Sequence, residues 1–591
     1  MQSMWRVQPA NPRLADRLAR ELDLHPITAQ LLLNRGVHDR TQAIRFLQLS
    51  LESLDDPYRL PDMDRAVSRL KRAIAAREPI LIFGDSDVDG LTASVILYEA
   101  LRERGAVVRA RSSNRLTDGY GIPRPFAHRL ARSSTRLLIV VDCGTNQPEE
   151  IRLLEASGIE TIIIDHHVPL EGWAIPHALV NPHRGDGVGR PQTASFGTPG
   201  ASTIGVDAEC RAQQALGLRP PPPSAGVPGL GRELCSAGLA LKVVQALGGG
   251  RRDDGVARVL DLASLGTLAD CAPLVGENRI IVSAGLPRII QTHRPGLRRL
   301  CEETRTTEPV ADRIVRRLIP RLNASGRLGD ATAAWKLLLS GADEGIEEWV
   351  TATDRAHTTT KQLYRRILAE AQEQVNRLHF RDQFVMVVSG QGWHQGVMGP
   401  LAAQLAERYG RPSIAIAMEE HRGVGSGRST PLFNLLEALR RCQGSLVRFG
   451  GHAQACGLTV ERRQLESFRA LINQQASLTL GREGLLKTRT ADLELPLGAC
   501  ESRWVEEAAR LSPFGHGNPR PTIILRRLAI EATSARVARL SDGTTAMRAK
   551  GAFASLAPEG YYDVIGSPAL VEGELVLTVS DVRASQPPRL S

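Results

Sequence analysis

The sequence predicts a multidomain α/β protein with a parallel-sheet domain, a long connecting helix, a second α/β domain and a small C-terminal β-barrel. A chain of 591 residues is too long for one core, because single cores seldom grow past roughly 250 residues. From residue 79 short apolar β-type runs alternate with helical segments, a pattern typical of parallel sheets covered by helices. After about residue 485 the pattern changes to short strands, which favours a barrel.

The composition predicts a soluble, cytoplasmic protein with an anionic partner. Hydrophobic residues make up 42% of the chain and charged residues 23%, which argues against disorder of the whole chain. The 74 lysines and arginines exceed the 64 acidic residues, and this excess suits a polyanion such as nucleic acid. The eight cysteines form no C-x-x-C pair, which is typical of reduced thiols, and no apolar run is long enough to span a membrane. A monomer is the default expectation.

The first half of the chain contains a helical region and the first α/β domain. Residues 1–75 show helical periodicity, for example in "ITAQLLLNRG". Residues 76–350 hold the β-type runs "PILIFGD", "VVRARSS", "RLLIVVD" and "ETIIIDHH", which predict the parallel sheet. Within this domain, residues 183–232 are rich in Gly, Pro, Ser and Thr and predict a long loop or insertion.

The second half contains three further elements. Residues 351–380 have many good helix formers and an apolar stripe, which predicts a helix joining two lobes. Residues 381–480 begin with the strand "FVMVVSG" and form a second α/β domain. Residues 485–591 contain short strands such as "TIILRRLAIEAT" and "ELVLTVSDVR", for which a five-stranded oligonucleotide-binding (OB) barrel is a natural candidate.

Acidic and imidazole side chains follow three of the strands in the first domain. Their residues are Asp85, Asp87 and Asp89 after the first run, Asp142 after "LLIVV", and Asp165, His166 and His167 after "TIII". The carboxyl ends of parallel strands share one edge of a sheet, so these groups should meet. Clustered carboxylates repel one another unless cations neutralise them. Carboxylates with imidazole suit Mn²⁺ or Mg²⁺, and two such ions can activate water against a phosphoryl substrate.

Two of these stretches also have simpler interpretations. An isolated Asp-His-His triplet could equally be a solvated strand end. The run from Asp85 to Gly90 superficially matches a calcium loop, but it lacks the glutamate at the last loop position and follows a buried strand.

The motifs in their order resemble the DHH phosphoesterase family. They are "GDSDVDGLTA", "VVDCGTN", "DHHVP", "LGTLADCAPLVGENR" and "PRLNASGRL", followed by "WHQGVMGP", "GSGRS" and "FGGHAQACG", which look like the DHH-associated domain. The resemblance implies a 5′-to-3′ exonuclease that acts on single-stranded DNA in repair and recombination and releases mononucleotides with Mn²⁺ or Mg²⁺. A helicase and a single-strand-binding protein are the implied partners.

The resemblance also implies roles for individual residues. The metal ligands would be Asp87, Asp89, Asp142, His166 and Asp270, with Asp85 completing one metal's shell. His167 would contact the scissile phosphate, and Asp165 would orient an imidazole. Without the family, Asp270 could merely cap a helix.

Phosphate-binding candidates lie in both domains. Those of the first are Arg321, Asn323 and Arg327, and those of the second are His394, Arg428, Gly450, Gly451 and His452. Arginine suits phosphate contact, glycines allow close backbone approach, and Arg428 is a candidate clamp for the terminal 5′ phosphate. His452 could instead be a buried structural histidine, and "RLNASGR" a helix-ending turn.

Some features depart from the family pattern. Ser86 stands where the family usually has an aromatic residue, and Tyr561 and Tyr562 are the visible candidates for base stacking in the β-rich tail. Two alternative functions remain: a phosphodiesterase for short oligonucleotides or cyclic dinucleotides, and a catalytically inactive replication scaffold. The extra N-terminal region and barrel argue against the first, and the complete set of predicted metal ligands argues against the second.

Overall fold

The computed structural model describes residues 4–117, 119–170, 172–184, 231–249, 254–339, 341, 344–378, 383–451, 453–480, 488–554, 556 and 560–586. The chain divides into two compact units. One unit lies within residues 50–486, and the other combines residues 1–49 with residues 487–591. Most of the loop or insertion predicted over residues 183–232 lies outside the described residues.

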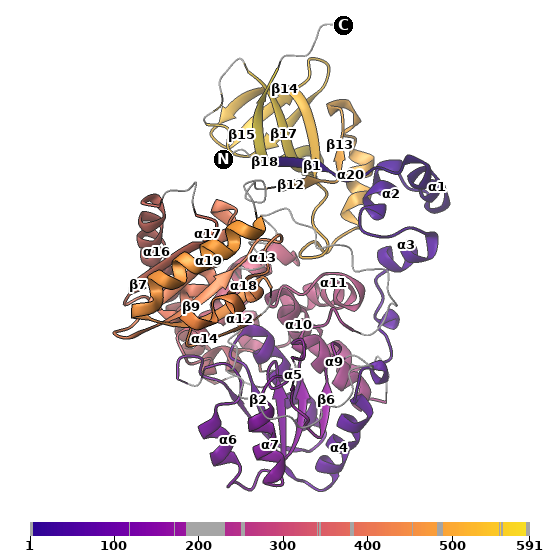
Figure 1. Cartoon of the computed structure of the whole chain (residues 1–591). Helices are drawn as coiled ribbons and strands as arrows, with labels where there is room; N and C mark the ends of the chain where they lie inside the picture. The colour runs from indigo at the N-terminus through magenta and orange to yellow at the C-terminus, as the bar shows by residue number, and fades with distance from the viewer. Residues whose placement is uncertain are drawn as a thin grey trace. The chain divides into compact units, whose positions relative to one another are not determined.

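The first sheet of the larger unit is parallel throughout, as predicted (Figure 1). Its strand order is β3-β2-β4-β5-β6. The strands are β2 (Pro79–Gly84), β3 (Val107–Ser112), β4 (Leu137–Val141), β5 (Glu160–Ile164) and β6 (Ala178–Val180). Every residue of the central strand β4 is buried, which explains why its sequence "LLIVV" is apolar without alternation.

Helices cover this sheet and extend it into a helical layer. On one side α6 (Arg124–Leu130) and α7 (Pro148–Ala156) share a core cluster with Phe83, Val140 and Ile163. α4 (Met63–Ala75) contacts β6, and α5 (Val88–Glu103) contacts β2 and β3. The layer beyond α5 consists of α9 (Ser236–Leu247), α10 (Asp254–Ala269), α11 (Gly276–Ile290), α12 (Pro295–Glu303), α13 (Ala311–Arg317), α14 (Ile319–Arg327) and α15 (Thr332–Leu337).

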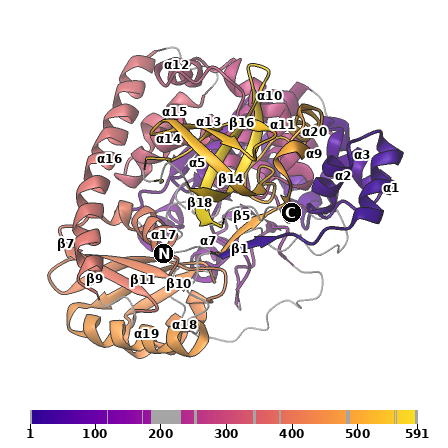
Figure 2. The ribbon, with the colours of Figure 1, turned by 90° about the horizontal axis from the view of Figure 1, so that it is seen from above.

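A single long helix, α16 (Ile346–Asn376), connects this layer with the second sheet. Its 31 residues correspond to about 45 Å of helix at 1.5 Å per residue. It packs against α14 and α15 at one end and against β7 (Met386–Gln391) at the other. Figure 2 shows it running from the neighbourhood of α12 to that of β7.

The second sheet is mixed, with strand order β10-β11-β9-β8-β7 and a parallel pair only at β7–β8. Its two faces pack on different helices, because alternate residues of a strand point to opposite sides: Val387 and Ile416 join the cluster of α18 and α19, whereas Val388 and Ala417 join that of α16 and α17. The elements are β7 (Met386–Gln391), α17 (Met398–Tyr409), β8 (Ser413–Met418), β9 (Arg422–Arg428), α18 (Leu435–Arg441), β10 (Arg448–Gly451), β11 (Ala455–Glu461) and α19 (Leu465–Leu480).

The smaller unit joins the N-terminal helices to the C-terminal strands. One core contains Leu18 and Leu31 of the N-terminal region together with Trp504 and Leu525, and β1 pairs in parallel with β12. Its elements are β1 (Met4–Val7), α1 (Pro12–Leu22), α2 (Pro26–Leu33), α3 (Arg40–Leu47), β12 (Thr488–Ala491), β13 (Leu493–Glu494), α20 (Ser502–Ala509), β14 (Ile523–Ser534), β15 (Val537–Ser541), β16 (Ala546–Lys550), β17 (Tyr561–Val571) and β18 (Glu574–Ser585).

The last five strands pair in a ring. β14 pairs with β15 and β17, β16 pairs with β15 and β18, and β18 pairs with β17. Tyr562 belongs to the core of this unit and is only 6% exposed. The expectation that Tyr562 stacks on bases is therefore wrong, because its ring is used for packing.

Among the described residues, none of the helices combines the length and the apolar character that crossing a membrane requires.

Candidate metal centre and active site

Three aspartates lie side by side where adjacent strands end. The last residues of β2, β4 and β5 are neighbours, since Gly84 pairs with Val141 and Val141 with Ile164. The next residue on each strand is an aspartate, Asp85, Asp142 and Asp165, and all three are at most 3% exposed. The strand order reverses direction at β2, because the chain goes from β2 to β3 on one side and to β4 on the other. Open α/β sheets bind ligands at such switch points.

Helix α5 brings two more carboxylates to this edge. Asp87 caps the helix, accepting a hydrogen bond from the Gly90 amide at 3.1 Å. Asp89 lies in the first turn and is 2% exposed. The short segment after β2 and the first turn of α5 therefore place three acids of one motif at the end of one strand.

Ligand-type atoms converge in three overlapping groups, each with its atoms within 4.8 Å of one another. The groups are Asp85, Asp87 and Asp142; Asp89, His166 and Asp270; and Asp142, His166 and His167. We call Asp85, Asp87, Asp89, Asp142, His166 and Asp270 the acid cluster. Oxygen-rich sets with imidazole fit Mn²⁺ or Mg²⁺, so the donors at this edge suit the predicted metals.

His166 lies among three of the carboxylates. Its Nε2 is 3.4 Å from Asp142 Oδ1 and 3.9 Å from Asp89 Oδ2, and its Nδ1 is 3.9 Å from Asp270 Oδ2. Asp270 directly follows the end of α10, so a residue more than one hundred positions along the chain completes this group.

His167 is held by groups other than the acid cluster. Its Nδ1 lies 2.6 Å from Asp165 Oδ1, and its backbone amide donates to the same oxygen at 3.2 Å. Asp165 Oδ2 accepts the Thr145 amide at 3.3 Å, and the Tyr120 hydroxyl lies 3.3 Å from the imidazole nitrogens. The structure thus places Asp165 where it orients the imidazole of His167.

The acid cluster is electrostatically strained. Burial raises the pKa of Asp142 well above its ordinary value, and the Asp87 and Asp89 carboxylates raise it further. Burial also raises the pKa of Asp89, although His166 opposes this. The pKa of His166 is raised well above its ordinary value, because Asp270 and Asp142 outweigh the opposing effect of burial. Divalent cations would favour the charged carboxylates and so offset both the burial and the mutual repulsion that raise the pKa values of Asp142 and Asp89.

Sequence reasoning missed two residues of the loop after β3. Arg115 forms ion pairs with Asp85 and, at 2.9 Å, with Asp87. For Asp87, burial favours a higher pKa, but Arg115 and the Gly90 amide outweigh it and lower the pKa. Tyr120 donates to the Asp142 carbonyl at 3.2 Å as well as contacting His167. The signal was available, because β3 is a parallel neighbour of β2 and its loop ends at the same edge.

The predicted phosphate-binding residues of α14 have mixed surroundings. Arg321 forms an ion pair with Asp354 at 3.1 Å. Asn323 Oδ1 accepts the Val88 amide at 3.0 Å and so caps α5. Arg327, the last residue of α14, packs against the second domain: a Cβ on Gly396 would lie 2.3 Å from the Arg327 carbonyl oxygen.

In the second domain, the predicted residues lie on β9, on β10 and in the loop before α17. His394 Nδ1 accepts the Gly396 amide at 3.1 Å, and burial lowers the pKa of His394. Arg428 is 5% exposed and donates to Ser426 Oγ at 3.1 Å and to the Gly427 carbonyl at 2.9 Å. Gly450 and Gly451 end β10, and Gly451 has a φ of 129° that favours glycine. His452 lies outside the described residues.

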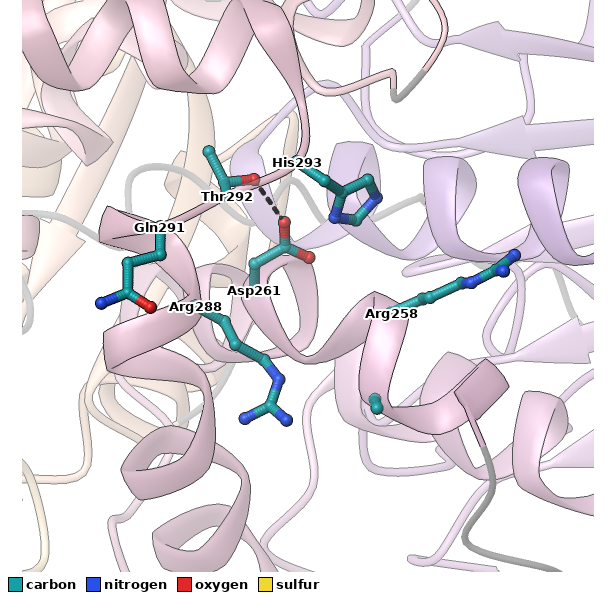
Figure 3. A pocket seen from close by; sticks show the side chains of 7 residues that line it. Arg258, Asp261, Arg288, Gln291, Thr292 and His293 are labelled. Atoms are coloured by element: carbon teal, nitrogen blue, oxygen red, sulfur yellow. Dashed lines mark hydrogen bonds between the residues drawn. The ribbon is translucent and has the colours of Figure 1, made fainter.

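A cavity of about 290 Å³ opens beside α10 and α11 (Figure 3). It is lined by Ala257, Arg258, Asp261, Arg288, Gln291, Thr292 and His293. These residues are distinct from the acid cluster, whose ligand groups lie at the sheet edge.

The fold and this site define a DHH-type phosphoesterase. The model of the DHH family, N-terminal domain, matches residues 79–267, and that of the DHHA1 domain matches residues 382–478. Among curated relatives, the single-stranded-DNA-specific exonuclease RecJ of Dickeya dadantii is 31% identical over 518 residues, covering 84% of this chain and 83% of the relative. The RecJ of Bacillus subtilis is 30% identical over 531 residues, and this chain covers 62% of its length.

A solved structure agrees with these relatives. The crystal structure of RecJ in complex with Mn²⁺ from Thermus thermophilus superposes with a TM-score of 0.79 at 25% identity, covering 99% of this chain and 80% of that one. The chain belongs to the RecJ family of DHH proteins.

Proposed function

We propose that this protein is a metal-dependent 5′-to-3′ exonuclease that acts on single-stranded DNA in repair and recombination and releases mononucleotides. The observation that carries the proposal is the acid cluster, in which Asp142 belongs to two of the three ligand groups at the sheet edge. Relatives named single-stranded-DNA-specific exonuclease, and a neighbour solved with Mn²⁺, support the same reaction.

Two Mn²⁺ or Mg²⁺ ions are the proposed cofactors. Asp85, Asp87 and Asp142 would hold one ion, and Asp89, His166 and Asp270 would hold the other, with Asp142 near both. A pair of such ions supplies an activated water and stabilises the leaving oxygen of a phosphodiester. The protein therefore needs no nucleophile of its own.

The remaining side chains at the edge orient and neutralise the substrate. Asp165 and Tyr120 hold the imidazole of His167 in place to donate to the scissile phosphate. Arg115 adds a fixed positive charge beside Asp85 and Asp87, which offsets part of the repulsion between the acids and the phosphate.

The position of helix α14 supports a path for the single-stranded DNA from the acid cluster to the second domain. A Cβ on Gly326 would lie 2.3 Å from the Ser86 carbonyl oxygen, and one on Gly396 equally close to that of Arg327. The first acidic motif therefore packs against the end of α14, and the end of α14 packs against the second-domain loop that contains Gly396. We assign phosphate contacts to Arg327 and His394 along this path, whereas the internal contacts of Arg321 and Asn323 favour a positioning role.

In the second domain we assign the terminal 5′ phosphate to Arg428 and the backbone of Gly450 and Gly451; His452, the further candidate from the sequence, lies outside the described residues. β9 and β10 both pair with β11, with Arg428 opposite Ala455 and Gly451 opposite Cys456. Because Ala455 and Cys456 are neighbours on β11, Arg428 and the two glycines lie in the same region of the sheet. A phosphate held here would fix the 5′ end and set the direction of digestion.

The ring of β-strands β14–β18 is the proposed OB-fold. It binds the single-stranded DNA outside the catalytic domain. Its support is a basic outer face on the hairpin of β15 and β16: Arg539 pairs directly with Arg548, and Arg536 and Lys550 are also exposed. Glu574 neutralises part of this charge by pairing with Arg548 at 3.0 Å. Like charges directly opposite across strands are unfavourable unless an anion lies between them.

The proposed setting is the cytoplasm, where the protein would act as a monomer. A helicase would expose its strand and a single-strand-binding protein would cover it. The described cysteines form no disulfide with one another, which suits a reducing compartment.

The deciding experiment digests three substrates with purified protein and Mn²⁺. A 5′-phosphorylated single strand should yield mononucleotides, a blunt duplex should persist, and a dinucleotide should be cleaved more slowly than the long strand. Preference for the dinucleotide would favour the short-substrate phosphodiesterase, and inactivity on all three would favour the scaffold.

A further inference from the structure

The N-terminus of α9 contacts two candidate metal ligands through one residue. Ser236 is fully buried, with 0% exposure. Its amide donates to Asp89 Oδ2 at 2.8 Å, and its hydroxyl donates to Asp142 Oδ1 at 3.0 Å. The next amide, that of Ala237, donates to Asp89 Oδ1 at 2.8 Å. Asp89 and Asp142 come from α5 and from the end of β4, so α9 connects two separate elements of the site.

The serine hydroxyl is not used for capping its own helix. The residue at the cap position is Cys235, which makes no side-chain capping hydrogen bond. The carboxylate of Asp89 satisfies the first amides of α9 instead, as expected for an anion at a helix N-terminus. This leaves the hydroxyl of Ser236 directed at Asp142.

Asp142 is the ligand candidate for which orientation matters most. Its backbone has a φ of 62°, in the left-handed region, which is unfavourable for a residue other than glycine and is found at functional sites. Its carboxylate belongs both to the group with Asp85 and Asp87 and to the group with His166 and His167. A small rotation of this carboxylate would disturb both groups at once.

We propose that Ser236 is a positioning residue of the metal centre: its hydroxyl fixes the carboxylate of Asp142 between the two ligand groups, while its amide fixes Asp89. The inference rests on the proposed function, because it assigns Ser236 a role toward the metals of that site. Groups that orient ligands in this way typically contribute roughly 10- to 100-fold to metal affinity or activity.

The test measures Mn²⁺ binding by isothermal titration calorimetry on the full-length chain. Ser236→Ala and Ser236→Gly remove the hydroxyl but keep the backbone amide that donates to Asp89. We expect both to weaken Mn²⁺ binding about 10-fold, and to lower kcat on single-stranded DNA with little change in KM. The matched control is Ser264→Ala on α10, since Ser264 is equally buried but its hydroxyl donates to the Ile281 carbonyl at 2.8 Å.

Three outcomes are distinguishable. Mn²⁺ affinity within twofold of the parent in both Ser236 variants would overturn the positioning role. An equal loss in Ser264→Ala would also overturn it, because the effect would then be general loosening. A parent protein that binds Mn²⁺ but digests no DNA would refute the proposed function, while the affinities would still decide the role of Ser236.

Discussion

Two clusters of buried charge in the larger unit are built in opposite ways. Around Arg294 two acids share one cation: its Nη1 lies 3.0 and 2.8 Å from the two oxygens of Glu99, and its Nε donates to Asp261 at 3.0 Å. Thr292 donates to the same Asp261 oxygen at 2.8 Å (Figure 3). The acid cluster instead sets carboxylates beside one another, and burial together with these like charges raises the pKa values of Asp89 and Asp142.

The difference separates a structural network from a ligand site. An ion network that serves only the fold supplies its own counter-charges, because removing one partner costs several kcal/mol. An excess of one sign persists where a ligand provides the missing charge. The two clusters are also connected, since Glu99 and Asp261 lie on α5 and α10, the helices that bring Asp89 and Asp270 to the site.

The largest effect is expected from Asp142→Asn. Asparagine keeps the shape of the side chain and tolerates the left-handed backbone, but it removes the charge shared by two ligand groups. We expect nuclease activity with Mn²⁺ to fall by about three orders of magnitude, because a metal contributes several kcal/mol to the transition state. The metal-free stability should not fall, since repulsion within the acid cluster is relieved.

The measurement pairs single-turnover rates with thermal unfolding in EDTA. Asp64→Asn, on the exposed start of α4, is the control for a general effect of losing one acid. An Asp142→Asn protein with near-parental activity would contradict the metal assignment, and one that unfolds well below the parent in EDTA would place Asp142 among the structural charges instead.

Unlike Asp142→Asn, Arg294→Met is expected to lower the stability of the protein. It leaves Glu99 and Asp261 without their shared cation, so we expect a loss of about 3–5 kcal/mol in unfolding free energy. Mn²⁺ affinity of the folded protein should change little. Urea unfolding is the measurement, with Arg258→Met as the matched control, because the ion pair of Arg258 with Glu103 is mostly exposed. Equal urea midpoints for the two variants would contradict the structural role of the Arg294 network.

The sheet edge could be predicted from sequence because it depends on one rule. Adjacent parallel strands end together, and the aspartate after each apolar run follows from that register. The parallel sheet and the multidomain α/β class followed from the same alternation. What the rule does not give is the path of a loop: Arg115 and Tyr120 reach the site by folding back from β3, and no periodicity encodes that return.

Capping hydrogen bonds between elements that are distant in the chain could not be predicted from the sequence either. Asn323 was predicted to contact phosphate from its motif, yet its Oδ1 accepts the Val88 amide of α5. The sequence around Ser236, "LCSAGLALK", does not indicate its role, because its partners Asp89 and Asp142 are more than ninety residues away. The shared core of the N-terminal helices and the C-terminal strands is another long-range contact of this kind.

Arg428→Ala tests whether a buried arginine binds an anionic ligand, as the acid cluster is proposed to bind cations. Its Nη1 donates to the neutral oxygens of Ser426 and Gly427. If it also holds the terminal phosphate, its loss should reduce kcat/KM on 5′-phosphorylated strands by about 10- to 100-fold, as for other hydrogen bonds to charged groups. Strands with a 5′ hydroxyl should be affected much less. An equal reduction on both substrates would assign Arg428 to the fold.

The smallest effect is expected in the ring of strands β14–β18, from the double variant Arg539→Ala with Arg548→Ala. Removing two like charges that face each other across β15 and β16 should leave the unit as stable as before or slightly more stable. Binding of single-stranded DNA should weaken, and the slope of log affinity against log salt should become shallower by about two, one for each lost phosphate contact. Arg526→Ala is the matched control, because Glu494 and Asp563 each pair with Arg526 at 2.8 Å. If the control flattened the salt dependence and the double variant did not, the binding face would have to lie near β14 and not on the hairpin, and facing like charges would no longer identify ligand sites in this protein.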